Sequence, residues 1–258
     1  IPTFNRAFDI DQSLYALRNQ SYQGFEIIVV DNSSSDNTAE VISKQQGYWQ
    51  HRLRYFVKSP NGPASARNFG SERSTTDYLV YLDSDVRLDT EWLALALEKI
   101  NSDPRIGAVG GQVIYDFDHQ KINAFGGDIG FFGLAWDLEE GSRVASCGYV
   151  AQRIWSNCSA MIVRASAYQA IAGFDEQFFY GYEDSDFGWK LNLIGHQVWV
   201  IPELKAYHNV QPQPGLANAQ IVFHYCKNRL RSLLKNSELA GLLFRLPVYL
   251  LYTVTDLI

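Results

Sequence analysis

Residues 78–85 read Tyr-Leu-Val-Tyr-Leu-Asp-Ser-Asp, an apolar run that passes directly into two carboxylates. A short run that is apolar throughout is typical of a strand covered on both faces inside a parallel sheet. Apolar residues then recur at helical spacing from Trp92 to Ile100 and predict a helix. This stretch therefore predicts a buried strand with an acidic carboxyl end, followed by a helix.

The same unit is repeated upstream. An apolar run over residues 26–30 ends in Asp31, and residues 53–57 form a further run. The helices expected in this half cover residues 9–19, 36–46 and 64–72. We therefore expect an α/β fold with a mostly parallel central sheet flanked by helices on both faces. Ligands of such sheets bind outside the carboxyl ends of the strands, where Asp31 and Asp83 both lie.

The pattern changes in the second half of the chain. Residues 116–148 are Gly-rich and aromatic without clear periodicity, which is typical of lids and binding loops. The tail over residues 216–258 is expected to be mainly helical, with breaks near Gly241 and Pro247. The remaining strands are expected at 107–115, 159–164 and 197–201, and the remaining helices at 165–171 and 183–194.

These elements predict a main domain over residues 1–210 and a helical C-terminal extension over residues 211–258. The opening residues Ile-Pro-Thr-Phe-Asn resemble the end of a strand and the loop after it. We therefore expect the first strand of the fold to lie before residue 1.

Composition limits the classes of function. A chain of 258 residues with 47% hydrophobic and 19% charged residues fits one large globular domain. Its net charge of −6 argues against a general nucleic-acid binder. The three cysteines, Cys147, Cys158 and Cys226, form no metal-type pair and are odd in number. We therefore expect no disulfide framework, and a reducing, cytoplasmic compartment.

The polar residues at the predicted strand ends suggest nucleotide and metal chemistry. Asp83 and Asp85 can face a common divalent cation and a ribose hydroxyl, since Mg²⁺ and Mn²⁺ prefer oxygen ligands. Asp31 can accept hydrogen bonds from a base or a ribose, and Arg67 can reach a phosphate or a base. Each of these motifs taken alone is equally consistent with a turn, a helix cap or a surface side chain.

The order of the motifs is more informative than any one of them. The chain carries P-T-F-N at 2–5, V-D-N-S-S-S-D at 30–36, N-G-P-A-S-A-R-N at 61–68 and Y-L-D-S-D at 81–85. G-F-D-E at 173–176, G-Y-E-D-S-D-F at 181–187 and His208 follow. Over residues 1 to about 210 this series resembles the GT2 glycosyltransferases, which have the GT-A fold. The stretches after Tyr180 are similar to rhamnosyltransferase-like members.

The resemblance implies a catalytic domain that binds a nucleotide-sugar donor. The residues it assigns to the donor are Pro2, Thr3, Asn5, Asp31, Ser33, Asn61, Arg67, Asp83 and Ser84. It implies a Mn²⁺ or Mg²⁺ cofactor held chiefly by Asp85, with Asp83 and His208 as further ligands. A lone histidine can equally be structural.

The resemblance also implies an inverting reaction. Asp184 is the expected general base, and Glu183 beside it orients the acceptor. A predicted helix N-terminus next to Asp184 is expected to keep its carboxylate ionised, although both acids could simply cap that helix. Trp155 is a candidate acceptor contact, with core packing as the alternative.

The expected activity is transfer of a sugar from dTDP-rhamnose or a UDP-sugar to a hydroxyl of a glycan or lipid-linked acceptor, in the synthesis of a cell-surface polysaccharide. The apolar tail over residues 239–258 contains Pro247 and two charged residues, so it is a poor membrane span. We expect peripheral contact with the inner face of the membrane, or packing of the tail on the domain. The alternative function is a non-catalytic sugar-nucleotide-binding or scaffold protein on a transferase fold.

Overall fold

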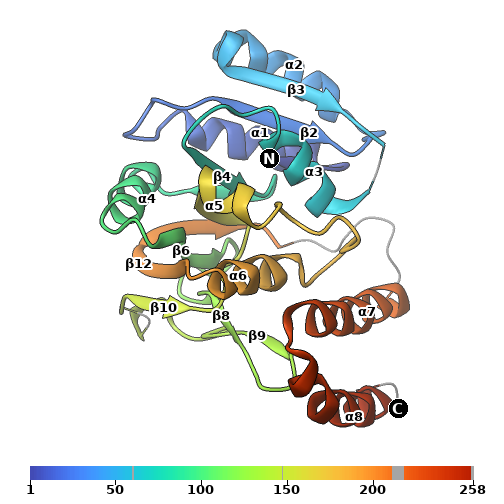
Figure 1. Cartoon of the computed structure of the whole chain (residues 1–258). Coiled ribbons are helices and arrows are strands. Elements are labelled where there is room, and N and C mark those ends of the chain that lie inside the picture. Colours follow the sequence, from blue (N-terminus) through green and yellow to red (C-terminus); the bar gives the residue numbers. More distant parts are fainter. Residues whose placement is uncertain (60, 147, 211–217, 257–258) are drawn as a thin grey trace.

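The computed structural model describes residues 1–59, 61–146, 148–210 and 218–256. Helices pack around two sheets, and the C-terminal helices lie together at one end of the molecule (Figure 1). The helices are α1 (Ala7–Leu17), α2 (Thr38–Trp49), α3 (Gly62–Ser71), α4 (Trp92–Asn101), α5 (Ala165–Ala170), α6 (Glu183–Leu193), α7 (Asn218–Asn236) and α8 (Leu239–Asp256).

The first sheet is parallel, as the repeated strand–helix units predict. Its strands are β1 (Pro2–Thr3), β2 (Ile27–Asp31) and β3 (Leu53–Val57), in the order β1-β2-β3. Thr3 pairs with Asp31, and Asp31 pairs with Val57, so the carboxyl ends of these strands lie at the same edge. The alternation of helix and strand in the first half is therefore confirmed.

The second sheet has seven strands and is mixed, which corrects the expectation of a mostly parallel sheet. Strand β11 (Ala160–Arg164) runs antiparallel between β4 (Tyr78–Leu82) and β6 (Ile106–Tyr115), whereas β12 (Gln197–His208) is parallel to β6. The strands β5 (Val86–Leu88), β7 (Ile122–Ala124) and β10 (Ala151–Arg153) complete it. The direction of β11 differs from the expectation because no helix long enough for a crossover connection precedes this strand. The chain enters β11 from a loop instead.

Three further expectations need correction. The last strand extends to His208 instead of ending at Ile201, because it pairs with β5 as well as β6. The region 116–148 contains the hairpin of β8 (Gly127–Ile129) and β9 (Ala135–Asp137). The tail breaks between α7 and α8, at residues 237–238, and Pro247 lies inside α8. A single proline removes one backbone donor, a loss that this helix tolerates.

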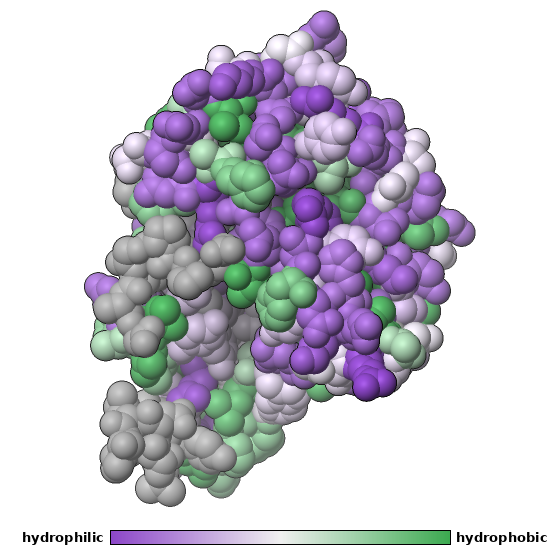
Figure 2. All heavy atoms as spheres, turned by 180° about the vertical axis from the view of Figure 1, so that it is seen from behind, coloured by the Kyte–Doolittle hydropathy of each residue, from purple (hydrophilic) through white to green (hydrophobic). Residues whose placement is uncertain are grey.

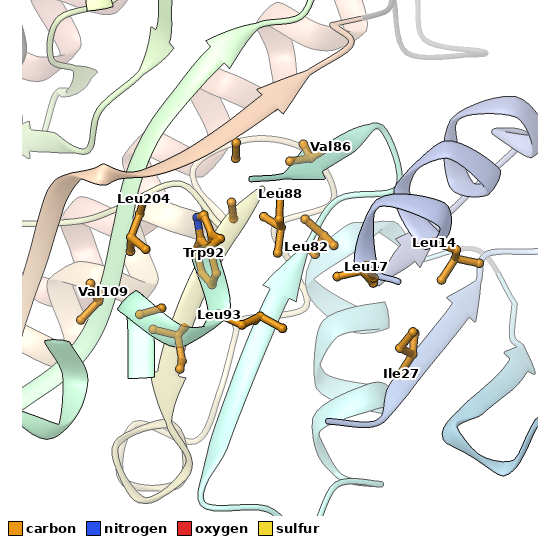
Figure 3. Close-up of a cluster of buried hydrophobic side chains, with 14 of the residues drawn as sticks. Leu14, Leu17, Ile27, Leu82, Val86, Leu88, Trp92, Leu93, Val109 and Leu204 are labelled. Carbon is orange, nitrogen blue, oxygen red and sulfur yellow. The ribbon is translucent and has the colours of Figure 1, made fainter. Parts of the chain in front are cut away.

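The main hydrophobic core fixes the strand that carries the two acidic residues. Figure 3 shows Trp92 of α4 among Leu82, Leu88 and Leu204, which come from β4, β5 and β12. Trp92 is fully buried. Since these side chains pack from three elements around the end of β4, the turn at residues 83–85 has little freedom to move.

The C-terminal helix α7 packs on the rest of the chain through α6 and the loop before it. Arg231 and Lys235 of α7 form ion pairs with Asp175 at 2.8 Å and 2.7 Å. Lys235 also contacts the buried Asp186 of α6 at 3.1 Å, and Asn236 donates a hydrogen bond to the same carboxylate. For the tail we expect either contact with the membrane or packing on the domain. Helix α7 packs on the domain.

No helix within the described residues combines the length and the apolar character needed to cross a bilayer. Seen from behind, the upper part of the molecule has a mainly hydrophilic surface, and hydrophobic residues are more frequent around the lower end, where the C-terminal helices lie (Figure 2).

Candidate active site

A cavity of about 590 Å³ opens where the carboxyl ends of β1 and β4 meet the start of α6. It brings together residues predicted from six separate parts of the sequence. The predicted residues that line it are Pro2, Thr3, Arg67, Asp83, Ser84, Asp85, Trp155, Glu183, Asp184 and His208.

The guanidinium of Arg67 lies at the centre of the site. Arg67 comes from α3 and is only 5% exposed. Its Nη2 donates to Asp83 Oδ1 at 2.8 Å and its Nη1 to Glu183 Oε1 at 3.1 Å, and Asp184 Oδ1 lies 3.6 Å from Nη1. Arg67 therefore holds the acidic turn after β4 against the acidic start of α6. Here its guanidinium makes these internal ion pairs, and its contact with a base or phosphate stays a prediction.

Three carboxylates surround this one cation, and the pKa values of the two on α6 are shifted. Burial, with the neighbouring charge of Asp184, raises the pKa of Glu183 to about 7. Burial also raises the pKa of Asp184, although Arg67 opposes the shift. Desolvation therefore acts against the ionised form of Asp184 that the helix N-terminus is expected to favour.

Two carboxylate oxygens at the start of α6 are buried without a hydrogen-bond partner among the described residues. Asp184 Oδ2 accepts a hydrogen bond from the Cys158 N–H at 3.0 Å. Within the described part of the chain, Asp184 Oδ1 and Glu183 Oε2 are buried and have no hydrogen-bond partner. Buried polar atoms are nearly always satisfied, so these two oxygens are suited to accept hydrogen bonds from a ligand hydroxyl.

The backbone before Glu183 is strained. Gly181 and Tyr182 both have a positive φ, 74° and 70°, and such a conformation is costly for tyrosine. The Asn228 amide of α7 donates to the carbonyls of Tyr180 and Gly181 at 2.9 Å and 2.8 Å. The Tyr182 hydroxyl accepts the Ala135 N–H at 3.2 Å. The surrounding structure thus holds this turn, which directs Glu183 and Asp184 into the cavity.

Asp85 and His208 meet at another part of the cavity wall. Antiparallel pairing of β5 with β12 places His208 opposite Val86, and its Nε2 lies 3.4 Å from Asp85 Oδ1. Asn123 Oδ1 lies 2.8 Å from Nδ1, and Nε2 faces Asp85. The structure therefore brings these two residues together although they are far apart in sequence.

Asp85 and His208 each shift the pKa of the other toward the charged form. Burial would raise the pKa of Asp85, but the hydrogen bond and charge of His208, followed by Arg6, hold it below its ordinary value. Burial would lower the pKa of His208, but Asp85 outweighs burial and raises it.

The donor set of this pair fits a divalent cation. A carboxylate and an imidazole whose other nitrogen is held by an amide are common ligands, and substrate phosphates and water supply further positions. Asp83 forms an ion pair with Arg67 through its Oδ1, and its role as a further metal ligand stays a prediction. The described residues contain no cluster of three or more acidic, histidine or cysteine side chains that could hold a metal by themselves.

Four predicted donor residues do not line the cavity, and three of them make hydrogen bonds within loops of this structure. Asp31 Oδ1 accepts both the N–H and the hydroxyl of Ser34, and its Oδ2 accepts the Tyr55 hydroxyl at 2.5 Å. Ser33 donates its hydroxyl to the Lys58 carbonyl. In the same region Asn5 Oδ1 accepts the Ser35 N–H at 2.7 Å. Asn61 is the residue before the first turn of α3.

Trp155, the aromatic residue predicted to contact the acceptor, is buried for the most part. Trp155 is 5% exposed, and its backbone and Cβ pack so closely on Gly188 that a Cβ there would lie 2.4 Å from the Trp155 Cβ. Trp136, Asp137, Asn157 and Tyr225 also line the cavity and were not predicted. No periodicity or motif in the sequence marks them, because they reach the cavity through the β8–β9 hairpin, the segment before β11 and α7.

Comparisons with known proteins agree with this geometry. The sequence profile of Glycosyl transferase family 2 matches residues 1–129. An uncharacterized glycosyltransferase of Haemophilus influenzae is 35% identical over 122 residues, which are 47% of this chain and 49% of that protein. The GalNAc(5)-diNAcBac-PP-undecaprenol beta-1,3-glucosyltransferase of Campylobacter jejuni is 31% identical over 103 residues, 39% of this chain and 33% of that protein. These matches span half or less of the length of both relatives.

The fold is also found among solved structures. A mannosyltransferase from Pyrobaculum calidifontis, in complex with GDP-Man and Mn²⁺, has a TM-score of 0.66 to this chain at 18% sequence identity. The likeness covers 93% of this chain and 65% of that chain, so it includes both sheets.

We expect Arg67→Met to lower the free energy of unfolding at pH 7.5 by about 3–5 kcal/mol, because it leaves buried carboxylates without a cation. The guanidinium lowers the pKa of Glu183 and Asp184, so its removal lifts both further above their unfolded-state values. The loss of unfolding free energy is then complete at high pH, and it becomes smaller as the pH falls and the carboxyls protonate. Urea unfolding at pH 5.5, 6.5 and 7.5 measures it.

Arg105→Met is the control for this prediction. Arg105 forms an ion pair with Asp103 that is exposed to solvent, and we expect its loss to change stability little at any of these pH values. A deficit of Arg67→Met that is constant with pH would contradict the central role of the guanidinium.

Proposed function

Because the chain belongs to glycosyl transferase family 2 and has its GT-A fold, we propose that it is an inverting, metal-dependent glycosyltransferase. It moves a sugar from a nucleotide-diphosphate sugar to a hydroxyl of an acceptor. The observation that carries the proposal is the bridge made by Arg67, which connects the Asp83 turn to Asp184 across one cavity.

Ion pairs connect the residues of the site one after another. Asp85 and His208 lie at one end, and Asp83 beside them reaches Arg67. Arg67 in turn contacts Glu183 and Asp184. A donor whose diphosphate lies at the Asp85 end would present its anomeric carbon toward Asp184. This order supports a leaving group and a base on opposite sides of the reacting carbon.

The chemistry proposed for the chain's residues is a single displacement. The acceptor hydroxyl donates a hydrogen bond to Asp184 Oδ1, and its proton passes to that carboxylate as its oxygen bonds to the anomeric carbon. The bond from the anomeric carbon to the diphosphate oxygen breaks on the opposite face, and its electron pair leaves with the diphosphate. Inversion follows because attack and departure occur on opposite faces. The raised pKa of Asp184 makes its carboxylate a stronger base than an exposed aspartate.

Asp85 and His208 are the residues that would hold a Mn²⁺ or Mg²⁺ ion. Such an ion, when bound, neutralises charge on the departing diphosphate. The Mn²⁺ in the similar mannosyltransferase complex supports this part of the proposal. Pro2, Thr3, Ser84 and the remaining residues predicted for the donor keep that role as a proposal.

The donor and acceptor are proposed by chemical class. The donor is dTDP-rhamnose or a UDP-sugar, and the acceptor is a glycan or a lipid-linked glycan in cell-surface polysaccharide synthesis. The printed name of the Campylobacter jejuni relative, which contains an undecaprenol diphosphate, supports a lipid-linked acceptor.

We also propose peripheral contact of α8 with the cytoplasmic face of the membrane. Leu239, Leu243 and Phe244, in the first two turns of α8, are 79%, 72% and 74% exposed. Exposed apolar side chains of this kind are suited to the lipid interface. The basic residues Arg231 and Lys235 contribute less than expected, because Asp175 and Asp186 pair with them.

Asp85→Asn should weaken Mn²⁺ binding by at least about 10-fold, a loss seen even for groups that only support a metal ligand. Isothermal titration with Mn²⁺ in the presence of UDP or dTDP measures it. Asp89→Asn, on the same segment but outside the cavity, should bind as the wild type does. Equal affinities of wild type and Asp85→Asn would remove Asp85 from the proposed metal site.

Asp184→Asn should lower kcat for sugar transfer by about 10²–10⁴-fold, because no base takes the hydroxyl proton. Its KM for the donor should stay within about twofold of wild type, since Asp184 faces the acceptor. NMR of the product should show an inverted anomeric centre in the wild type, and Asp77→Asn on the exposed surface is the control. Retention would contradict the mechanism, and nucleotide binding without any turnover would favour the scaffold alternative.

The double variant Leu243→Glu/Phe244→Glu should bind vesicles of phosphatidylethanolamine and phosphatidylglycerol at least tenfold more weakly than wild type, because two charged groups then face the lipid. Co-flotation with the vesicles measures binding. Val57→Glu changes an exposed apolar residue remote from α8 and should bind normally. Equal flotation of all three chains would rule out α8 as the contact.

A further inference from the structure

Asp137 is a largely buried carboxylate in the cavity wall that the proposed displacement does not use. It lies at the end of β9, where it pairs with Gly127 of the β8 strand. Its Oδ1 accepts a hydrogen bond from the Asn157 amide at 3.3 Å. Desolvation raises the pKa of Asp137 to about 6, with a smaller contribution from Glu140. The fold therefore keeps a carboxylate in a place where ionisation is unfavourable, as binding sites commonly do.

Asn157 connects this carboxylate to the reaction centre. The next residue, Cys158, donates its backbone N–H to Asp184 at 3.0 Å, so Asn157 is adjacent along the chain to a group that touches the proposed base. The Oδ1 of Asn157 is buried and has no hydrogen-bond partner within the described residues. A carboxylate and an amide side by side offer both acceptors and donors, the pattern that neighbouring hydroxyls of a sugar require.

The position along the cavity decides which substrate these residues face. Asp85 and His208, where the leaving diphosphate is proposed to lie, connect through Asp83 and Arg67 to Asp184. Asp137 and Asn157 lie beside Asp184, to which they connect through the Cys158 N–H. In an inverting displacement the acceptor lies on the side of the base, opposite the leaving group. Groups beside the proposed base are therefore placed to contact the acceptor.

We propose that Asp137 and Asn157 bind neighbouring hydroxyl groups of a sugar on the acceptor, beside Asp184, and so set acceptor specificity. Tyr225 of α7 also lines this part of the cavity, and its ring packs on Gly181. Its aromatic face is suited to a sugar ring, whose C–H groups are apolar. The inference rests on the proposed transferase function and adds the chemical class of the acceptor.

The test uses the whole chain with Mn²⁺, UDP-glucose or dTDP-rhamnose as donor, and a panel of p-nitrophenyl glycosides as acceptors. Release of nucleoside diphosphate is measured without acceptor, when water attacks, and with each glycoside. Asp137→Asn and Asn157→Ala should raise the KM for a stimulating glycoside at least tenfold. In both variants, the rate of diphosphate release without acceptor and the KM for the donor should stay within twofold of wild type.

Glu140→Gln is the matched control, because Glu140 is exposed, lies in the same segment and does not line the cavity. It should match wild type in every measurement. Asp137→Asn should also melt at or above the wild-type temperature, because the folded protein disfavours the charged form that it removes. A KM effect in a variant that melts normally is then a binding effect.

The outcomes separate the inference from the function on which it rests. A wild type that releases no diphosphate from either donor would overturn the proposed function, and the inference with it. An active wild type overturns the inference alone in three cases: no glycoside stimulates release, the variants leave the acceptor KM unchanged, or the variants slow release without acceptor as much as transfer.

Discussion

The arrangement of the site depends on one buried guanidinium. Arg67 contacts Asp83 from the end of β4 and Glu183 and Asp184 from the start of α6, three acids that come from two segments distant in the chain. Carboxylates this close repel one another, and burial disfavours their charged forms. The shared cation lets the three acids remain together, while the pKa values of Glu183 and Asp184 stay raised.

The segments that carry these acids are held in place on both sides of Arg67. On the β4 side, the core around Trp92 holds the strand end, and the β5–β12 pairing brings His208 to Asp85. On the α6 side, α7 supports the left-handed turn through Asn228 and neutralises the buried Asp186 through Lys235. The C-terminal extension is thus part of the structure that places the proposed base. Strain at Tyr182 persists because several contacts oppose its relaxation.

The cavity is consequently polar at both ends for different reasons. At one end Asp85 and His208 stabilise each other's charged forms, an arrangement suited to a cation and a diphosphate. Toward the other end, around Asp184 and Asp137, burial raises the pKa of the carboxyls, and these groups are suited to accept protons or hydrogen bonds from hydroxyls. One chain of contacts through Arg67 connects these two environments.

Much of this follows from the sequence. The apolar runs before Asp31 and Asp83 predict buried strands because burial on both faces requires such runs, and the helices beside them follow from local periodicity. The order of the motifs also predicts that Asp83, Asp184 and His208 reach one cavity, as they do. Tertiary structure alone decided the direction of β11, the extension of β12 to His208, the Tyr55 hydroxyl that engages Asp31, and the place of Asp137. Each of these depends on contacts between residues distant in sequence, whereas periodicity records only which face of a local element is buried.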